Sequence, residues 1–143
     1  MKVNHWSLPN GATCVVANME DSTLTCIDFW CKGGSNYEMK NEEGMAHFLE
    51  HMLFIGTEKY PEPDGYLQFV RANGGRSNAY TASDLTNYFF DIGSHAFREG
   101  FDRFAQFFIA PLFSRDYVER EKNAVNAEYQ MQFKDDGWRS NSV

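Results

Sequence analysis

The sequence predicts one α+β domain in which a sheet rich in antiparallel strands packs against helices. A length of 143 residues is typical of a single domain, and a composition that is 43% hydrophobic and 23% charged is ordinary for a globular protein. The strand and helix signals follow the order strands, helix, helix, hairpin, helix, helix, instead of alternating as in a parallel α/β fold. We therefore treat residues 1–143 as one domain.

Extended segments open the chain. The pair Asn10-Gly11 is typical of a tight turn between strands, and residues 13–17 and 23–32 are predicted to be extended. Gly33, Gly34 and Ser35 follow the second segment and end it.

A helix is predicted next, from Asn41 to about Phe54. The Asn41 side chain can accept a hydrogen bond from a free backbone amide of the first turn. Glu42 and Glu43 place negative charge where the helix dipole favours it, and Gly56 is the expected C-terminal stop.

The middle of the chain is predicted to hold a short helix and a hairpin. The helix spans about residues 63–72 and ends at Asn73-Gly74-Gly75. Residues 76–82 and 87–92 are predicted strands, and the short segment between them suits a hairpin loop.

Two longer helices close the predicted fold. Ser94 is predicted to cap a helix that runs to about Ile109 and stops before Pro111, and Ser114 to cap another that runs to about Phe133. The first of them carries phenylalanines at helical spacing, which favours a core stripe over a ligand pocket: Phe97, Phe101, Phe104 and Phe108.

The charge of the chain argues against two classes of partner. Lysine and arginine total 13 against 20 aspartate and glutamate residues, which gives a formal net charge of −7, and no basic cluster is present. Nucleic-acid binders normally present a basic face, so no nucleic acid is expected as a partner. No segment approaches the roughly 20 apolar residues that span a bilayer, so no membrane is expected either.

Cys14, Cys26 and Cys31 are predicted to pack as small buried hydrophobic residues and not to bind zinc. Their odd number and the lack of a CxxC pair argue against a closed disulfide framework, with one disulfide and one free thiol as the alternative. This pattern favours a reducing compartment. The compartment stays unknown, with the cytoplasm slightly favoured over the periplasm.

The segment from His47 to His51 is the candidate for chemistry. At about 100° per residue, His47, Glu50 and His51 lie on one side of the predicted helix. The opposite side is apolar and can anchor the helix in a core: Met45, Phe48, Leu49, Met52 and Leu53. Histidines four residues apart are about 5–6 Å apart at Cβ, close enough to bind one ion with bonds of about 2.0–2.1 Å.

A catalytic zinc ion needs three protein ligands and an open position for water. His47 and His51 supply two, and Glu128 in the last predicted helix is the candidate for the third, although such acidic helix faces are more often only solvated. Glu50 lies beside the ion and suits a base that accepts a proton from water. Glu121, two helical turns before Glu128, could orient a ligand. Because both histidines must be neutral to bind, metal affinity is expected to fall below about pH 6.5.

The order His-x-x-Glu-His resembles the inverzincins, in which the usual zinc-protease motif is inverted. The segment GMAHFLEHMLFIGTEKYP at 44–61 is similar to the active-site segment of the insulysin/pitrilysin peptidases. The similarity continues in SNAYTASDLTNYFFD at 77–91, DRFAQFFIAPLF at 102–113 and EREKNAVNAEYQ at 119–130. It covers the chain from about Leu8 to Arg139.

The resemblance implies a zinc metalloendopeptidase with one Zn²⁺ per chain. His47, His51 and Glu128 match the zinc ligands of the family, Glu50 matches its catalytic base, and Glu121 matches an acidic residue that supports the site. The implied reaction is hydrolysis of peptide bonds in oligopeptides or small proteins by a zinc-activated water.

The resemblance also implies how a peptide substrate binds. Asn78 and Ala79 match an edge strand whose backbone and amide groups hold an extended peptide by strand addition. Family members are longer and enclose the peptide between several related domains. The chain is therefore expected to be the first, N-terminal zinc-binding domain of a pitrilysin-like (LuxS/metallohydrolase-like) architecture, truncated at its C-terminal end.

Two alternatives to an active peptidase stay open. One is a zinc-binding, peptide-binding fragment without turnover, because the C-terminal half can supply the electrostatic groups on which catalysis depends most. The other is a metal-free fragment that associates with itself through apolar faces left exposed by truncation. His5 and His95 have no partner at ligand spacing and are interpreted as ordinary polar residues.

Overall fold

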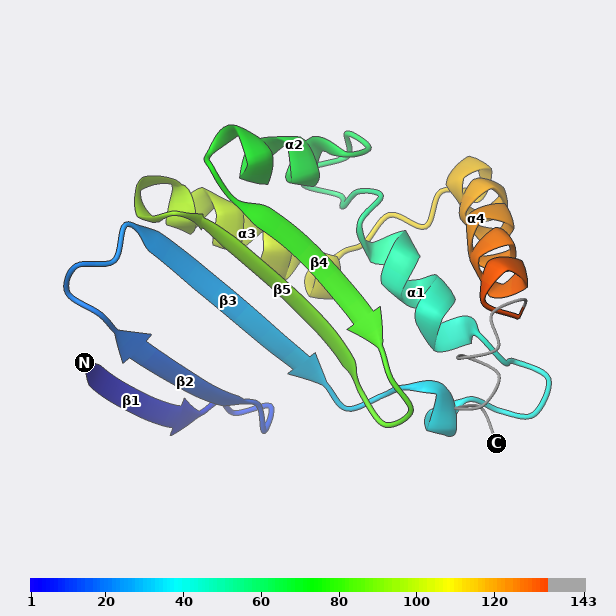
Figure 1. The fold of residues 1–143 in the computed structure, drawn as a ribbon, viewed down its shortest axis with the longest axis horizontal. Helices are drawn as coiled ribbons and strands as arrows, with labels where there is room; N and C mark the ends of the chain where they lie inside the picture. The colour runs from blue at the N-terminus through cyan, green and yellow to red at the C-terminus, as the bar shows by residue number, and fades with distance from the viewer. Residues whose placement is uncertain (134–143) are drawn as a thin grey trace.

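The computed structural model describes residues 1–133, and within them it forms two antiparallel sheets (Figure 1). β1 (Lys2–Ser7) and β2 (Thr13–Asn18) pair with each other. β3 (Leu24–Cys31), β4 (Arg76–Thr81) and β5 (Thr86–Gly93) form a three-stranded sheet in the order β3-β5-β4. β4 is therefore an edge strand of this sheet.

The predicted strands are confirmed with small shifts at their ends. Residues 13–17 and 23–32 correspond to β2 and β3, and residues 76–82 and 87–92 to β4 and β5. Asn10-Gly11 lies in the turn between β1 and β2, where the φ of 86° at Gly11 is one that glycine tolerates best.

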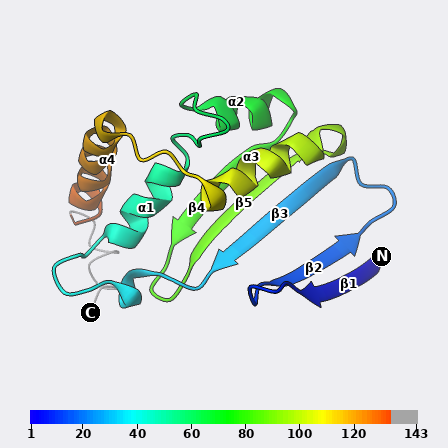
Figure 2. The same ribbon diagram turned by 180° about the vertical axis from the view of Figure 1, so that it is seen from behind.

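The α-helices are α1 (Met45–Leu53), α2 (Gly65–Ala72), α3 (Phe97–Ile109) and α4 (Arg115–Phe133). Figures 1 and 2 show α2 and α3 on one face of the β3-β5-β4 sheet, while α1 lies beside β4 and α4 lies beside α1 on the outside. The predicted α+β class, an antiparallel sheet packed against helices, is confirmed. No helix in the described part of the chain is long and apolar enough to cross a membrane.

Aromatic side chains fill the space between the sheet and its helices. The Phe90 ring of β5 lies 5.0 Å from Phe104 of α3 and 6.2 Å from Tyr66 of α2, measured between ring centroids. Phe107 lies 4.8 Å from Tyr66. In the predicted phenylalanine stripe, Phe104 is buried and Phe97 packs against the core, whereas Phe101 and Phe108 are 45% and 38% exposed. The reason is that α3 turns Phe104 and Phe107, three residues apart, toward the sheet.

The predicted cap of the first helix is wrong. Asn41 lies four residues before α1 in a left-handed turn with a φ of 84°, and Gly44 occupies the N-cap position. The free amides of the first turn bind the Glu38 carboxylate instead, at 2.8 Å from Gly44 N to Oε2 and 2.8 Å from Ala46 N to Oε1. The Glu38 carboxylate, from outside the helix, therefore accepts the hydrogen bonds that were predicted for the Asn41 side chain.

Ser94 is also not the cap of its helix. It is the first residue of a 3-10 turn, η2 (Ser94–Ala96), and Ala96 is the N-cap residue of α3. The Ser94 hydroxyl forms a hydrogen bond with the Thr25 hydroxyl of β3 at 3.0 Å, so it is not available to the helix. Ser114 does precede α4, and its carbonyl accepts the first helical hydrogen bond from Val118 N at 3.0 Å.

The prediction that the cysteines are buried is wrong for two of them. All three are free thiols, but Cys26 and Cys31 are exposed and Cys14 is half-buried. Cys26 belongs to the residues of β3 that point to the sheet face without helices, and Cys31 is the last residue of the strand.

The loop after α1 is tied to α3. Lys59 Nζ lies 2.6 Å from Asp102 Oδ2, and the Tyr60 hydroxyl donates a hydrogen bond to the same carboxylate. The hydrogen bonds from Lys59 and Tyr60 lower the pKa of Asp102. Arg103 stacks over the Tyr60 ring at 4.2 Å. These contacts hold the chain where it leaves the helix that carries the candidate site.

Candidate metal centre

Two histidines of α1 and one glutamate of α4 converge at the surface between these helices. His47 Nε2 lies 3.2 Å from His51 Nε2 and 3.5 Å from Glu128 Oε2, and His51 Nε2 lies 3.7 Å from the same oxygen. Ligand atoms of a tetrahedral zinc ion with bonds of about 2.0–2.1 Å are about 3.3–3.4 Å apart. The spacing of the three atoms therefore fits one metal ion.

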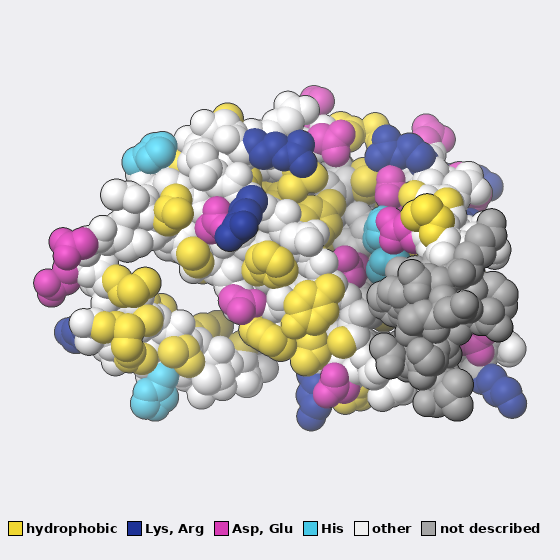
Figure 3. Space-filling view, viewed as in Figure 1, with side chains coloured by type: hydrophobic (Ala, Val, Ile, Leu, Met, Phe, Trp, Pro, Cys, Tyr) yellow, Lys and Arg dark blue, Asp and Glu magenta, His cyan; other side chains and the backbone are white. Residues whose placement is uncertain are grey.

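The chemistry of this donor set also fits a cation. Two imidazole nitrogens and a carboxylate oxygen are donor atoms that zinc commonly binds, and a cation between them would neutralise the carboxylate. Within residues 1–133 this is the one group of three or more ligating side chains close enough to share an ion. Figure 3 shows histidine and acidic side chains gathered where α1 and α4 meet.

Glu121 lies beside the other ring nitrogen of His51. Glu121 Oε2 lies 3.4 Å from His51 Nδ1, a contact that suits the tautomer in which Nδ1 carries the proton and donates to the carboxylate. In that tautomer the lone pair of Nε2 is directed toward His47 and Glu128, which is the arrangement usual for metal-binding histidines. Arg120 donates to the other Glu121 oxygen at 3.0 Å and holds the carboxylate in place.

Glu50 lies on the inner side of α1, against β4. Its side chain is buried at 8% exposure, and the Thr81 hydroxyl donates a hydrogen bond to Glu50 Oε2 at 2.5 Å. The pKa of Tyr88 on β5 is raised, mainly by burial and also by the negative charge of Glu50. A carboxylate is therefore kept in a largely apolar position beside the two histidines.

The sequence-based division of α1 into an apolar and a polar face is only partly right. Met52 and Leu53 are buried as predicted, but Met45 and Leu49 are exposed and Glu50 is buried. The reason is that α1 packs on β4 with one side and on α4 with another, so the helix has two covered sides instead of one.

Asn78 and Ala79 lie on β4, as predicted. They pair with Phe89 and Tyr88 of β5, and no strand in the described residues pairs with the other edge of β4. Asn78 is exposed and Ala79 is buried, as expected for neighbours that point to opposite faces of a strand. The backbone groups of the free edge can pair with another extended chain.

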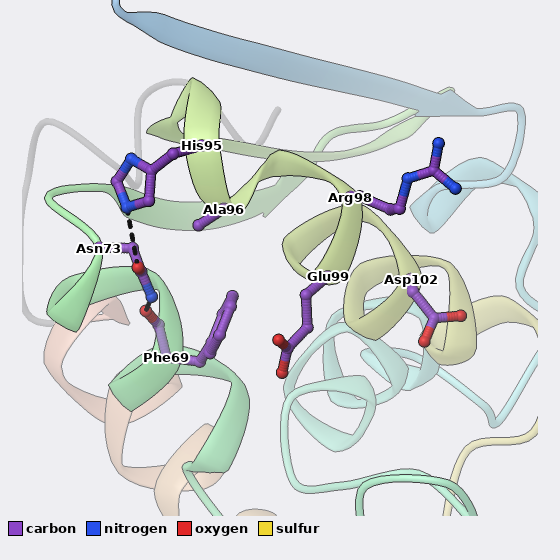
Figure 4. Close-up of a pocket in the computed structure, with 7 residues that line it drawn as sticks. All are labelled: Phe69, Asn73, His95, Ala96, Arg98, Glu99 and Asp102. Carbon is purple, nitrogen blue, oxygen red and sulfur yellow. Dashed lines mark hydrogen bonds between the residues drawn. The ribbon is translucent and has the colours of Figure 1, made fainter.

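The remaining histidines lie outside the metal-binding group. Figure 4 shows His95 and Asn73 on the border of a hollow of about 670 Å³ between α2 and α3, with His95 Nε2 3.2 Å from Asn73 Oδ1. His5 is an exposed residue of β1. Both agree with their interpretation as ordinary polar residues.

Two residues at the site carry no sequence signal of their own. Glu38 caps α1 across a turn, and Thr81 reaches Glu50 from a strand 31 positions away in the sequence. Neither contact could be recognised from a sequence motif, because each depends on how the elements pack in three dimensions.

The fold and the His-His-Glu group together define a metallopeptidase-type protein. Residues 14–141 match the family model described as insulinase, peptidase family M16. The chain belongs to this family.

Named relatives agree with this assignment. The chain is 54% identical over 106 residues to the peroxisomal insulin-degrading enzyme-like 1 of Arabidopsis thaliana, covering 74% of this chain and 11% of that protein. It is 49% identical over 107 residues to the insulin-degrading enzyme of Homo sapiens, covering 74% and 10%. A Caenorhabditis elegans protein with "zinc protease" in its name is 41% identical over 132 residues, covering 92% and 15%.

Solved structures show the same fold. Pitrilysin superposes with a TM-score of 0.87 at 32% identity, covering 95% of this chain and 14% of that chain. A protease from Helicobacter pylori superposes with a TM-score of 0.84 at 27% identity, covering 92% and 32%. The chain thus spans between 10% and 15% of the length of the curated relatives named above.

The predicted cofactor, one zinc ion, agrees with both kinds of finding. The chain belongs to a peptidase family in which a relative is named a zinc protease. The described residues include a His-His-Glu group whose ligand atoms lie close enough together to bind one metal ion.

Proposed function

We propose that this chain is the zinc-binding domain of a zinc-dependent endopeptidase that hydrolyses oligopeptides or small proteins. The observation that carries the proposal is the convergence of His47, His51 and Glu128 at 3.2–3.7 Å beside the buried carboxylate of Glu50. The proposal treats residues 1–143 as one domain of a longer peptidase.

Each residue has a defined role in this proposal. His47, His51 and Glu128 hold the zinc ion, which when bound polarises a peptide carbonyl and lowers the pKa of water to about 7. Glu50 accepts a proton from the attacking water and passes it to the leaving amine. Glu121 keeps His51 in the tautomer that leaves Nε2 free to bind, which the 3.4 Å contact with Nδ1 supports.

The peptide substrate is proposed to bind as an additional strand along β4. The free edge of β4 offers backbone donors and acceptors, with Asn78 and Ala79 in its middle. α1 packs against the same strand, so a peptide on this edge passes close to Glu50. Strand addition recognises the backbone, which favours extended peptides over a single preferred side chain.

A zinc-binding, peptide-binding fragment without turnover is the second candidate. The chain covers between 10% and 15% of the curated relatives named above, and groups that stabilise the transition state can lie in the parts of those proteins that it does not cover. Self-association is a further outcome, supported by the exposed Leu24, Trp30 and Tyr80 on the sheet face without helices (Figure 3). The net charge of −7 opposes it.

Zinc analysis and a quenched-peptide assay test the proposal. We expect about one zinc per chain in the unaltered protein and in Glu50→Gln, with hydrolysis reduced at least about a hundredfold in the variant because its base is lost. His47→Ala is expected to lose the metal. His95→Ala is the matched control, since His95 lies outside the group, and should keep both zinc and hydrolysis.

The outcomes separate the candidates. Hydrolysis by Glu50→Gln at the unaltered rate would show that Glu50 is not the base. One zinc without turnover supports the peptide-binding fragment. A metal-free chain that sediments as oligomers supports self-association.

A further inference from the structure

We infer that Thr81 is a positioning residue for Glu50: its hydroxyl holds the carboxylate in the orientation needed to accept a proton. The inference rests on the proposed function, because it assigns Glu50 the role of base. Thr81 touches neither the candidate metal ligands nor, on this inference, the peptide bond that is cleaved. It acts through Glu50.

The contact between the two side chains is short and largely protected from water. Thr81 Oγ1 lies 2.5 Å from Glu50 Oε2, and Glu50 is 8% exposed. Among the residues that the structure describes, Thr81 is the one hydrogen-bond donor to this carboxylate. A hydrogen bond from a hydroxyl to an ionised carboxylate at this distance is of the strong, charge-assisted kind.

This hydrogen bond distinguishes the two oxygens of Glu50. Oε2 accepts the Thr81 hydrogen bond, which leaves Oε1 as the more basic oxygen and the one better placed to accept a proton from water. Without the hydroxyl, the carboxylate can rotate about its last bond, because that torsion is broad in glutamate. A base that is misoriented for part of the time loses turnover without losing the metal.

The backbone of Thr81 is itself held from two sides. Thr81 pairs with Thr86 of β5, and the loop that follows Thr81 contacts Gly34 and the 3-10 helix after it, η1 (Ser35–Tyr37). Ser35 N donates to Ala82 O at 3.1 Å. Gly34 packs so closely that a Cβ there would lie 2.1 Å from the Ala82 oxygen. Because threonine is also branched at Cβ, its hydroxyl has few alternative positions.

Thr81 also belongs to the strand proposed to hold the substrate. Glu50 is thereby linked by one hydrogen bond to the end of β4, whose free edge is proposed to bind the peptide. The base and the peptide-binding edge then keep a fixed relative position.

A double-mutant cycle in the metal-free chain tests the contact without requiring activity. Thr81→Val removes the hydroxyl and keeps the shape, and we expect it to lower the Tm by about 5 °C. In a Glu50→Leu background the same change should shift the Tm by less than about 1 °C, because no carboxylate is left to satisfy. An equal shift in both backgrounds would overturn the inference.

Steady-state kinetics of the zinc-loaded chain test the positioning role. Thr81→Val should lower kcat about tenfold with KM and zinc content unchanged, and Thr81→Ser, which keeps a hydroxyl, should recover most of kcat. Thr86→Val is the matched control, because the Thr86 hydroxyl is equally part of the hairpin but donates to Gly33 O at 2.8 Å. It should lower the Tm and leave kcat unchanged.

The two experiments keep the inference separate from the proposed function. An unchanged kcat in Thr81→Val, or an equal loss in Thr86→Val, overturns the positioning role. If the unaltered chain binds zinc but hydrolyses no peptide, the proposed function of the chain fails, and the double-mutant cycle alone decides whether Thr81 holds Glu50.

Discussion

Glu121 illustrates how one side chain sets the chemistry of another at the residue scale. It is largely buried, and its carboxylate lies 3.4 Å from His51 Nδ1, where it suits the tautomer that is protonated at that nitrogen. A neutral amide at the same position can still accept a hydrogen bond, but it no longer compensates the positive charge that a metal ion places on the imidazole.

Glu121→Gln is therefore expected to weaken zinc binding about tenfold or more without unfolding the chain. Competition with a fluorescent chelator measures the affinity. Glu119→Gln is the control, because Glu119 is an exposed residue of the same helix and the same charge. Equal affinities in Glu121→Gln and the unaltered chain would show that this carboxylate does not support the metal.

The two candidate metal ligands of α1 could be predicted from the sequence because their spacing is a property of the helix itself. His47 and His51 are one helical turn apart, and Glu50 lies between them. Glu128 lies in another helix, so no local spacing links it to the histidines, and the resemblance to the peptidase family supported it as the third ligand. Thr81 could not be predicted, because its approach to Glu50 depends on the packing of α1 on β4 and not on any local spacing.

At the scale of the element, the start of α1 depends on a residue outside the helix. Glu38 accepts hydrogen bonds from the amides of Gly44 and Ala46, both at 2.8 Å, and places negative charge at the positive end of the helix dipole. α1 has only nine residues, so a frayed first turn reaches His47 directly.

Glu38→Gln is expected to reduce the free energy of unfolding by about 1 kcal/mol and to weaken zinc binding as the first turn frays. Chemical denaturation and zinc titration measure the two effects. Glu42→Gln removes the same charge nearby and should have little effect, because its side chain lies exposed before the helix. Similar losses in the two variants would indicate a general charge effect and not a cap.

The elements themselves were predictable, and their ends less so. Hydrophobic patterning and turn residues placed the four α-helices and β2 to β5 within a few positions, whereas no bounds were predicted for β1. The prediction of Asn41 as the cap was wrong because Asn41 adopts a left-handed backbone conformation in a turn before the helix, which asparagine tolerates better than most residues. Ser94 failed because a neighbouring strand offered its hydroxyl a partner. Both failures arise from contacts that a local pattern does not contain.

At the scale of the whole molecule, aromatic residues make up 16% of the chain and join the sheet to the helices. Tyr66 and Tyr88 belong to this core, and burial raises the pKa of both phenols well above their usual value of 10. The Tyr66 hydroxyl donates to Ser77 Oγ at 3.0 Å. The core therefore depends on two phenols remaining protonated.

This dependence predicts a loss of stability in alkaline solution. A tyrosine whose pKa is raised in the folded state contributes stability below the unfolded pKa of about 10, and the contribution is lost as pH rises above it, because only the unfolded chain can release the proton. The Tm should fall steeply between about pH 10 and 12.

Tyr66→Phe should be less stable by about 1 kcal/mol at pH 7, because it lacks the hydrogen bond to Ser77. It should also lose less stability than the unaltered chain when the pH is raised, because it has one phenol fewer to titrate. Tyr37→Phe is the control, since Tyr37 is exposed, and its pH dependence should match the unaltered chain. If Tyr66→Phe shows the same alkaline loss as Tyr37→Phe, the titration of the Tyr66 phenol does not limit the stability of the core.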